Sequence, residues 1–326
     1  MNISTGKIGA NVVRVDLSGS GVRVAVGLAA RGVGAVEELA SIASRHGAVA
    51  AINGTFFNAY DKGPTQDPVG ALITGGVMVH KGGTGTVLGI SRSGDVRMDA
   101  VRFKIAGGTN GSWTWPNNWY AHHMNRAATG ANTAVLYTPA WSGEAGGDGG
   151  TCVVVSRGVV TAITSEKCRV PDDGFVLYVR GSETSLLQRF AIGTPAQWRV
   201  EFADGRQLDG FWASVTEALG AGPRLVKDGK VVYTEASARD EGFTDPKILT
   251  NSSARSAVGI TSGGELLLVT VASAKMLQLA EVMQQLGAVD AMNLDGGASS
   301  GLVFNGAYVT RPGRPLSNAL VVVVDG

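Results

Sequence analysis

The chain has 326 residues, of which 17% are charged and 44% are hydrophobic, so it has ample material for a buried core. Its 28 basic and 27 acidic residues leave a net charge of +1, which argues against nucleic acid as the main partner. No stretch approaches the roughly 20 consecutive apolar residues of a membrane-spanning helix.

The ends and the cysteines leave the cellular compartment open. The start, Met1-Asn2-Ile3-Ser4, has no charged segment followed by an apolar one, so no signal peptide is visible. The chain is then either a cytosolic protein or a mature protein whose leader has been removed. Cys152 and Cys168 either form one disulfide around a hairpin or remain two buried free thiols.

The first half of the chain predicts short strands, one helix and a long irregular segment. Its 47 glycines, about twice the usual usage, separate short β-branched runs and are typical of turns in a β-rich fold. In chain order we expect an opening hairpin of residues 12–17 and 22–28, a helix over 37–46, a buried strand over 48–52, several short strands over 69–105, and a surface excursion over about 107–150.

The second half predicts further hairpins and two helices. A helix over 275–286 has Met276, Leu279, Ala280, Met283 and Leu286 on one face, which indicates core packing. The other expected elements are strands over 152–156, 159–164 and 175–179, a helix over 183–190, a hairpin over 224–233 that turns at Asp228-Gly229, a hairpin over 256–271, and a last strand over 320–324.

Two segments of the chain repeat one another. Residues 47–53 and 287–293 agree at five of seven positions, and each follows a predicted helix, forms a buried strand and ends in asparagine. Coincidence among small residues is the alternative, but the repeated order favours a duplication. We therefore expect two helix–strand half-repeats around a central cleft, with Asn53 and Asn293 at neighbouring strand ends.

The segment from Asn293 to Ser300 carries the most chemistry. Asp295 follows a predicted strand, Gly296 and Gly297 allow backbone N–H groups to approach an anion, and two serines add hydroxyl donors. The carboxylate could act as a nucleophile, a base or an electrostatic stabiliser. A simple hairpin turn at residues 295–296 explains the spacing about equally well. The repeat at Asn53 favours function.

Other motifs in the chain are weaker. Residues 297–301 fit the G-x-S-x-G nucleophile elbow, but a short strand follows where a helix is needed, and all four histidines precede the serine. The pair His122-His123 has no partner with zinc-ligand spacing. Arginines at strand edges, which suit carboxylate or phosphate, remain as candidates: Arg180, Arg224, Arg255 and Arg311.

Taken together, these segments resemble the phosphodiester glycosidase family. The resemblance spans nearly the whole chain in order and implies one catalytic unit over residues 1–326, although Thr55 and Ala298 stand where glycine is often expected. The matching pieces are residues 51–58, 135–139, 222–225, 255–259, 293–300 and 311–318.

The resemblance implies a hydrolase that cleaves a sugar 1-phosphodiester, such as an α-N-acetylglucosamine 1-phosphodiester, at the glycosidic linkage. It also implies a secreted or envelope location. We expect Asp295 as nucleophile or base, Glu241 as a second carboxylate, and Arg255 as the phosphate ligand. The remaining expected substrate-binding residues are Asn53, Asn293, Gly296, Gly297, Ser299, Ser300, Arg224 and Arg311.

The chemistry is consistent with that assignment. A phosphodiester leaves readily as an anion, so one carboxylate with cationic and backbone donors for the phosphate can suffice. No cofactor and no metal are expected, and the partner is a sugar phosphodiester or glycan; the oligomeric state stays open. The predicted fold is a β-rich α/β (α+β) unit of mixed sheets with few helices.

Two other functions compete with this one. The first is a glycoside hydrolase that acts on an exopolysaccharide or cell-wall glycan without phosphate. Trp113, Trp115, Trp119 and Tyr120 suit stacking on sugars, although such residues also anchor long loops. The second is a non-catalytic carbohydrate-binding protein of the envelope.

Overall fold

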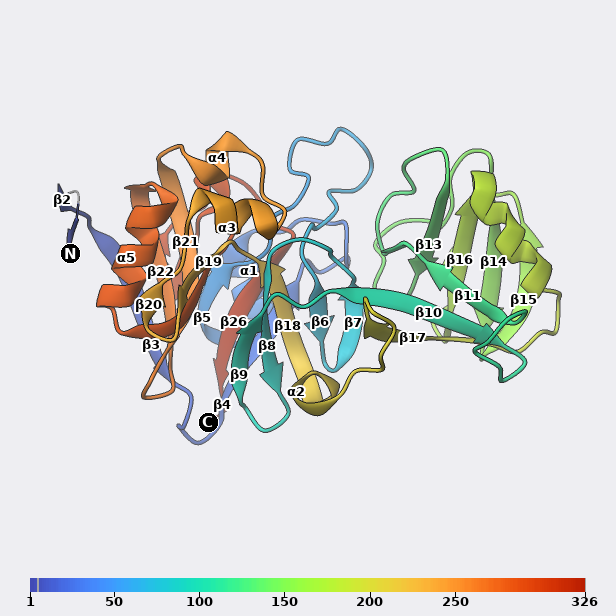
Figure 1. The fold of residues 1–326 in the computed structure, drawn as a ribbon, viewed down its shortest axis with the longest axis horizontal. Coiled ribbons are helices and arrows are strands. Elements are labelled where there is room, and N and C mark those ends of the chain that lie inside the picture. The colour runs from blue at the N-terminus through green and yellow to red at the C-terminus, as the bar shows by residue number, and fades with distance from the viewer. Residues whose placement is uncertain (5, 326) are drawn as a thin grey trace.

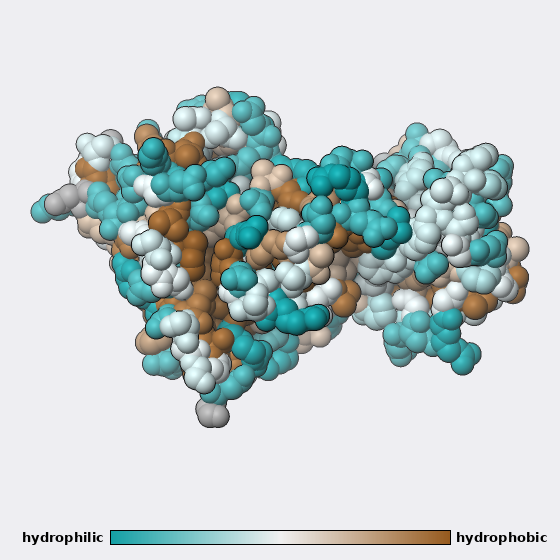
Figure 2. Space-filling view, turned by 60° about the horizontal axis from the view of Figure 1, so that its bottom comes forward, coloured by the Kyte–Doolittle hydropathy of each residue, from teal (hydrophilic) through white to brown (hydrophobic). Residues whose placement is uncertain are grey.

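The computed structural model describes residues 1–4 and 6–325. Figure 1 shows its strands gathered into a larger body and a smaller lobe at the other end of the molecule. We use "body" for residues 1–102 and 203–325, and "lobe" for residues 103–202. The lobe is inserted between two strands of one body sheet, β9 (Val96–Asp99) and β18 (Val215–Ala221). Figure 2 shows the lobe set off from the body by a narrower middle.

Three sheets form the body, and a two-stranded ladder of β1 (Asn2–Ile3) and β2 (Gly6–Lys7) precedes them. The first sheet has the order β25 (Ala307–Thr310), β24 (Leu302–Phe304), β5 (Ala48–Asn53), β26 (Asn318–Val324), β4 (Val22–Leu28). The second has the order β20 (Lys230–Val231), β19 (Arg224–Lys227), β23 (Ala288–Asn293), β21 (Ser253–Thr261), β22 (Glu265–Ala274), β3 (Ala10–Asp16). The third has the order β7 (Val77–His80), β6 (Leu72–Thr74), β18, β8 (Thr86–Ser91), β9.

Two sheets form the lobe, and the helices of the whole chain are short. The lobe sheets are β11 (Asn118–Ala121), β10 (Phe103–Thr109), β17 (Ala196–Phe202), and β12 (His123–Met124), β13 (Thr133–Tyr137), β16 (Gly174–Arg180), β14 (Gly150–Ser156), β15 (Val159–Thr164). The helices are α1 (Leu39–Arg45), the 3₁₀ helix η1 (Gly181–Arg189), α2 (Gly210–Ser214), α3 (Glu235–Asp240), α4 (Pro246–Leu249), α5 (Met276–Gln285) and η2 (Gly297–Ser299). The fold is thus a mostly-β α+β fold, as the sequence predicts.

The two predicted helix–strand units are both present. Helix α1 buries Leu39, Ile42 and Ala43 against the sheet that contains β5, and α5 packs in the same way on the sheet that contains β23. Residues three and four apart share one helix face, which is why these apolar positions form a stripe. Along β26, Ala319 and Val321 face α1, whereas Leu320 and Val322 face the central core between the sheets.

Several predicted elements take a different form in the structure. The predicted opening hairpin is wrong, because β3 pairs with β22 and β4 pairs with β26, in two different sheets. The predicted helix over 183–190 is a 3₁₀ helix, η1. The predicted excursion over 107–150 contains β11, β12 and β13 and belongs to the folded lobe. The turns at Asp228-Gly229 and Arg157-Gly158 have positive φ at both residues, which matches the primed hairpin turns.

Two further features are the cysteine pair and the length of the helices. Cys152 is buried, Cys168 is half-buried, and the two free thiols lie within hydrogen-bonding reach of one another. Within residues 1–4 and 6–325, no helix is long and apolar enough to cross a membrane.

Candidate active site

One pocket in the body brings together several of the polar groups that the sequence singles out. Its volume is about 430 Å³, within the range of small-molecule sites. We call it the Asp295 pocket. It is lined by residues of the loop after β5 (56–60), the segment around α4 (245–253), the turn after β23 (295–299), Arg255 on β21, and Arg314 before β26. Helix α4 lies at the upper edge of the body in Figure 1.

Asp295 is half-buried in this pocket, and its carboxylate is held by its own loop. The N–H of Gly296 donates to Oδ1 at 2.8 Å, and the hydroxyl of Ser299 also donates to the carboxylate. Burial raises the pKa of Asp295 to about 6, against the opposing effects of these two hydrogen bonds and of the Arg314 charge. The carboxylate is therefore ionised above a pH of about 6, where it can act as a nucleophile or a base.

The loop that carries Asp295 is clamped by Asn53. The Nδ2 of Asn53 donates to the Asp295 carbonyl at 2.7 Å, and its Oδ1 accepts from the Gly301 N–H at 3.0 Å. The Asp295 N–H in turn donates to the Gly54 carbonyl at 3.1 Å. Strand ends that are far apart in the sequence thus meet, as the repeat predicts. Asn53 is buried with both side-chain groups occupied, so it positions the loop and does not line the pocket.

Asn293 makes a similar clamp at the end of β23. Its Nδ2 donates to the Gly222 carbonyl at 2.9 Å, and the Gly222 N–H donates back to the Asn293 carbonyl at 2.8 Å. The side chain is buried and absent from the pocket lining. The two asparagines, which were expected to bind substrate, therefore bind backbone groups at the two strand ends.

Gly296 is required by the close approach of the turn after β23 to β21. A Cβ at this position would lie 2.9 Å from the Ala254 carbonyl oxygen, closer than real Cβ contacts, and 3.8 Å from Nη1 of Arg255. Gly297, which also lines the pocket, has a φ of 61° and begins η2. The two glycines thus let the backbone after Asp295 turn against β21.

Arg255 lines the pocket with one edge of its guanidinium unused. Its Nε donates to the Ala274 carbonyl at 3.2 Å, and its Nη2 donates to the carbonyls of Lys247 and Asn251 at 2.8 and 2.7 Å. Its Nη1 has no acceptor, and no carboxylate pairs with it, within the part of the chain that the structure describes. Burial lowers the pKa of Arg255. A buried guanidinium without a counter-charge is well placed to receive an anion.

Arg314 and Tyr60, which the sequence reasoning did not single out, form the outer rim. Nη2 of Arg314 donates to the Tyr60 hydroxyl at 2.7 Å, and the guanidinium carbon lies 4.6 Å from the centre of the Tyr60 ring. The Tyr60 side chain is 80% exposed. Arg314 lies within the family-like segment 311–318, but nothing in the sequence distinguishes it from Arg311.

The segment around α4 adds Asp245 and Lys247 to the lining. The Asp245 carboxylate caps α4 by accepting from the Lys247 N–H at 2.8 Å, and both side chains are exposed at the rim. Asp245 and Asp295 are the two carboxylates that line this pocket. Among residues 1–4 and 6–325, no three His, Cys, Asp or Glu side chains come together in the manner of metal ligands.

The remaining expected site residues lie outside the pocket lining. Glu241 accepts from the Arg224 N–H and the Thr86 hydroxyl, both at 2.8 Å, so its carboxylate braces the start of β19. Arg224 is paired with Asp290. Arg311 lies over the ring of Tyr308 at 4.0 Å on the exposed surface.

Ser300 and Arg180 are also placed elsewhere. Ser300 is buried beside η2, and its hydroxyl has no partner among the described residues. Arg180 lies at the end of β16 in the lobe, where its guanidinium donates to the carbonyls of Asp148 and Gly130. The site that the structure assembles thus keeps Asp295, Gly296, Gly297, Ser299 and Arg255, and gains Arg314 and Lys247.

The sequence of residues 149–323 matches the model of a known protein family, described as phosphodiester glycosidase. The chain belongs to the phosphodiester glycosidase family. The matched residues include Asp295, Arg255 and Arg314 but not Asn53. No curated protein sequence matches the chain.

Solved structures resemble this chain to different degrees. A hypothetical protein from Synechocystis is 25% identical with a TM-score of 0.84; the match covers 99% of this chain and 61% of that one, so this chain spans about three fifths of the relative. A protein from Burkholderia pseudomallei, provisionally named as exported, is 24% identical with a TM-score of 0.78, over 96% of this chain and 73% of the other. The catalytic domain of zebrafish N-acetylglucosamine-1-phosphodiester alpha-N-acetylglucosaminidase is 15% identical with a TM-score of 0.47, and the match covers 99% of this chain and 86% of that domain's chain. A likeness as distant as this last one supports no statement about residue roles.

Proposed function

We propose that the chain hydrolyses the glycosidic bond of a sugar 1-phosphodiester in the Asp295 pocket. The observation that carries this proposal is the meeting of one desolvated carboxylate, Asp295, with the unused guanidinium edge of Arg255 in a single pocket. Arg314 and Lys247 add two further cations at the rim. A volume of about 430 Å³ suits one sugar ring with its phosphate.

In this proposal, the cations hold the leaving phosphate. The bond between C1 of the sugar and the bridging oxygen breaks, and the phosphate monoester leaves with that oxygen and the bonding electrons. Nη1 of Arg255 and the side chain of Arg314 donate to the phosphate oxygens, on which negative charge increases. Because the leaving group is a stable anion, the reaction does not depend on a carboxylic acid that protonates it.

Asp295 acts on the sugar carbon or on the attacking water. As the ionised carboxylate, it either removes a proton from the water that attacks C1, or attacks C1 directly to form a glycosyl ester that water then hydrolyses to free sugar and the carboxylate. The hydrogen bonds from Gly296 and Ser299 orient its oxygens, and the clamp by Asn53 fixes the loop that carries it. Phe56, Phe57 and Ile248 supply the apolar walls.

A glycoside hydrolase without a phosphate requirement is the second candidate, because Asp245 places another carboxylate in the pocket lining. A general acid in such an enzyme is a carboxyl group kept protonated by burial. The Asp245 carboxylate is exposed and caps α4, so it lacks that environment. The three cations of the lining also favour an anionic substrate.

The test is hydrolysis of UDP-N-acetylglucosamine and of a methyl α-N-acetylglucosamine 1-phosphodiester by the wild type, Asp295→Ala and Arg314→Gln. Release of free sugar by the wild type, absent in Asp295→Ala, supports the proposal. Hydrolysis of aryl glycosides without hydrolysis of phosphodiesters supports the second candidate, a glycoside hydrolase. Ligand binding without turnover, unchanged in Asp295→Ala, indicates a carbohydrate-binding protein. A location outside the cytoplasm also belongs to this proposal, on the strength of the family alone.

A further inference from the structure

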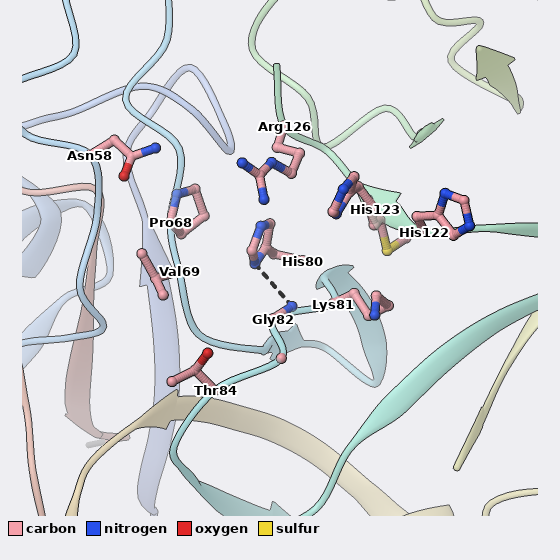
Figure 3. Close-up of a pocket in the computed structure, with 12 residues that line it drawn as sticks. Asn58, Pro68, Val69, His80, Lys81, Gly82, Thr84, His122, His123 and Arg126 are labelled. Atoms are coloured by element: carbon pink, nitrogen blue, oxygen red, sulfur yellow. Dashed lines mark hydrogen bonds between the residues drawn. The ribbon is translucent and has the colours of Figure 1, made fainter. Parts of the chain in front are cut away.

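A second pocket lies where the body meets the lobe, and its lining is basic. Its volume is about 360 Å³, and it is lined by the end of β7 and the following loop (80–84), the loop at 58 and 68–69, and lobe residues 122–124 and 126. We call it the His80 pocket. Figure 3 shows its side chains, with His80 and Arg126 pointing toward one another and His123 beside them.

Five basic side chains contribute to the His80 pocket, and no acidic one does among the described residues. They are His80, Lys81, His122, His123 and Arg126. Arg126 makes no hydrogen bond or ion pair with the described residues, and its Nε is buried without a partner. Lys81 is half-buried, and its Nζ reaches only the Phe103 carbonyl, at 3.4 Å. The two fixed charges are therefore free to meet a ligand.

Asp67, a buried carboxylate that precedes the lining in the chain, does not itself line the pocket, and its Oδ1 has no partner among the described residues. Oδ2 of Asp67 accepts from the Ala127 N–H at 2.9 Å, and Asp67 forms no ion pair with Arg126. The cations of the lining repel one another and no carboxylate of the lining pairs with them, so an anion from solution would relieve that repulsion.

The buried imidazole of His80 and the half-buried imidazole of His123 are subject to the same repulsion. Burial is the main cause that lowers the pKa of His80 to about 4, and the charges of Arg126 and Lys81 and the neighbouring His123 lower it further. The pKa of His123 is also lowered to about 4, by burial, then by Arg126, Lys81 and His122. Nδ1 of His80 lies 2.8 Å from the Gly70 carbonyl and 3.3 Å from the Gly82 N–H (Figure 3), so both backbone contacts fall on this nitrogen, and Nε2 has no hydrogen-bond partner among the described residues. A bound anion would favour protonation of both imidazoles.

We propose that the His80 pocket is a binding site for a phosphate group, with Lys81 and Arg126 as its charged ligands. The loop after β5 connects the His80 pocket to the Asp295 pocket, since Asn58 lines the first and Phe57 and Ala59 line the second. The phosphate can therefore come from free inorganic phosphate or from a phosphodiester in a glycan that also reaches the Asp295 pocket. The anion site does not depend on turnover of a sugar phosphodiester.

The test is a titration of the protein with inorganic phosphate, followed by the imidazole ¹⁵N resonances in NMR spectra. The chain has four histidines, and His46, at the end of α1, lies outside the pocket and serves as an internal control. We expect saturable shifts at His80 and His123, with none at His46. Arg126→Gln should weaken the affinity about ten-fold or more, because a charge-assisted hydrogen bond is lost.

The matched variants separate this site from others. Arg314→Gln, in the Asp295 pocket, and Arg169→Gln, on the exposed lobe surface, should leave the His80 and His123 shifts unchanged. Lys81→Gln, a change in the body and not in the lobe, provides the same test if Arg126→Gln fails to fold. An absence of saturable shifts, or equal affinity in the wild type and in the folded Lys81 and Arg126 variants, would overturn the proposal.

Dimethyl phosphate in place of inorganic phosphate distinguishes the two sources. If it binds as well as inorganic phosphate, the site accepts a phosphodiester of a glycan. If only inorganic phosphate binds, the site takes the free ion or a phosphomonoester. The measurement follows phosphate binding at the imidazoles. It can therefore confirm the anion site even if the protein does not hydrolyse sugar phosphodiesters.

Discussion

The half-buried carboxylate of Asp295 leads to a prediction about stability. Its pKa lies near 6 in the folded protein, against 3.8 for the free side chain. Each pKa unit corresponds to about 1.36 kcal/mol, so the difference corresponds to a destabilisation of about 3 kcal/mol when the group is ionised. The folded state binds the proton more tightly than the unfolded state, so this penalty is absent below pH 3.8, develops between pH 3.8 and about 6, and is complete above that window.

Asp295→Asn should therefore stabilise the protein in a pH-dependent way while it abolishes activity. At pH 8 we expect the variant to unfold with a free energy about 2–3 kcal/mol above that of the wild type, and near pH 4 we expect the two to be nearly equal. Turnover should fall by about 10³-fold or more. Urea denaturation followed by circular dichroism at both pH values measures the difference.

A matched control is Asp240→Asn, which changes an exposed carboxylate at the end of α3. This variant should show no pH-dependent gain. If Asp295→Asn and the wild type differ by the same amount at pH 4 and pH 8, the carboxylate is not desolvated in the way the structure indicates, and its role as a poised base would have to be abandoned.

Three further predictions concern the reaction and the lobe. If the ionised form of Asp295 is the catalyst, kcat/KM for a sugar phosphodiester rises with pH through about 6 and then levels; a flat profile from pH 5 to 8 would contradict this. Arg314→Gln should lower kcat/KM about 10–100-fold. The control Arg311→Gln, on the surface over Tyr308, should leave kcat/KM within about two-fold of the wild type. Equal effects of the two substitutions would remove Arg314 from the site. Oxidised glutathione should join Cys152 and Cys168 in a disulfide and raise the free energy of unfolding by about 3 kcal/mol. Thiol titration measures the disulfide, and urea denaturation measures the gain in stability. Thiols that stay titratable in the treated native protein would exclude the bond.

Much of the local structure follows from the sequence. The α5 stripe, the hairpin at Asp228-Gly229 and the strands before Asn53 and Asn293 are all set by periodicity and turn chemistry within a few residues. The repeat also predicts correctly that the two strand ends meet. What failed is pairing: β3 and β4 are adjacent in the chain, but each pairs with a strand more than 200 residues away. The Ser18–Gly21 turn does not encode that choice.

The roles of the candidate site residues divide in the same way. The Asp-Gly-Gly loop could be recognised because a carboxylate, a close backbone approach and a strand end are local features. The arginines could not be sorted, because each lies at or near a strand end and their partners come from elsewhere in the chain. Arg224 is paired with Asp290 on a neighbouring strand, Arg255 is held by the carbonyls of Lys247 and Asn251, and Arg314 alone among them meets Tyr60 at the rim.

The sequence by itself determined a β-rich chain, a carboxylate loop after one strand, and an asparagine at the end of each of two strands. These features follow from periodicity, turn residues and glycine requirements, which act over a few positions. Only the tertiary structure decided which side chains surround that carboxylate. The long-range pairing of strands brings the loop after β5, the α4 segment and Arg314 to the same point, and the burial this produces raises the pKa of Asp295. Desolvation and charge proximity depend on atoms that are near in space, and neither can be obtained from spacing along the chain.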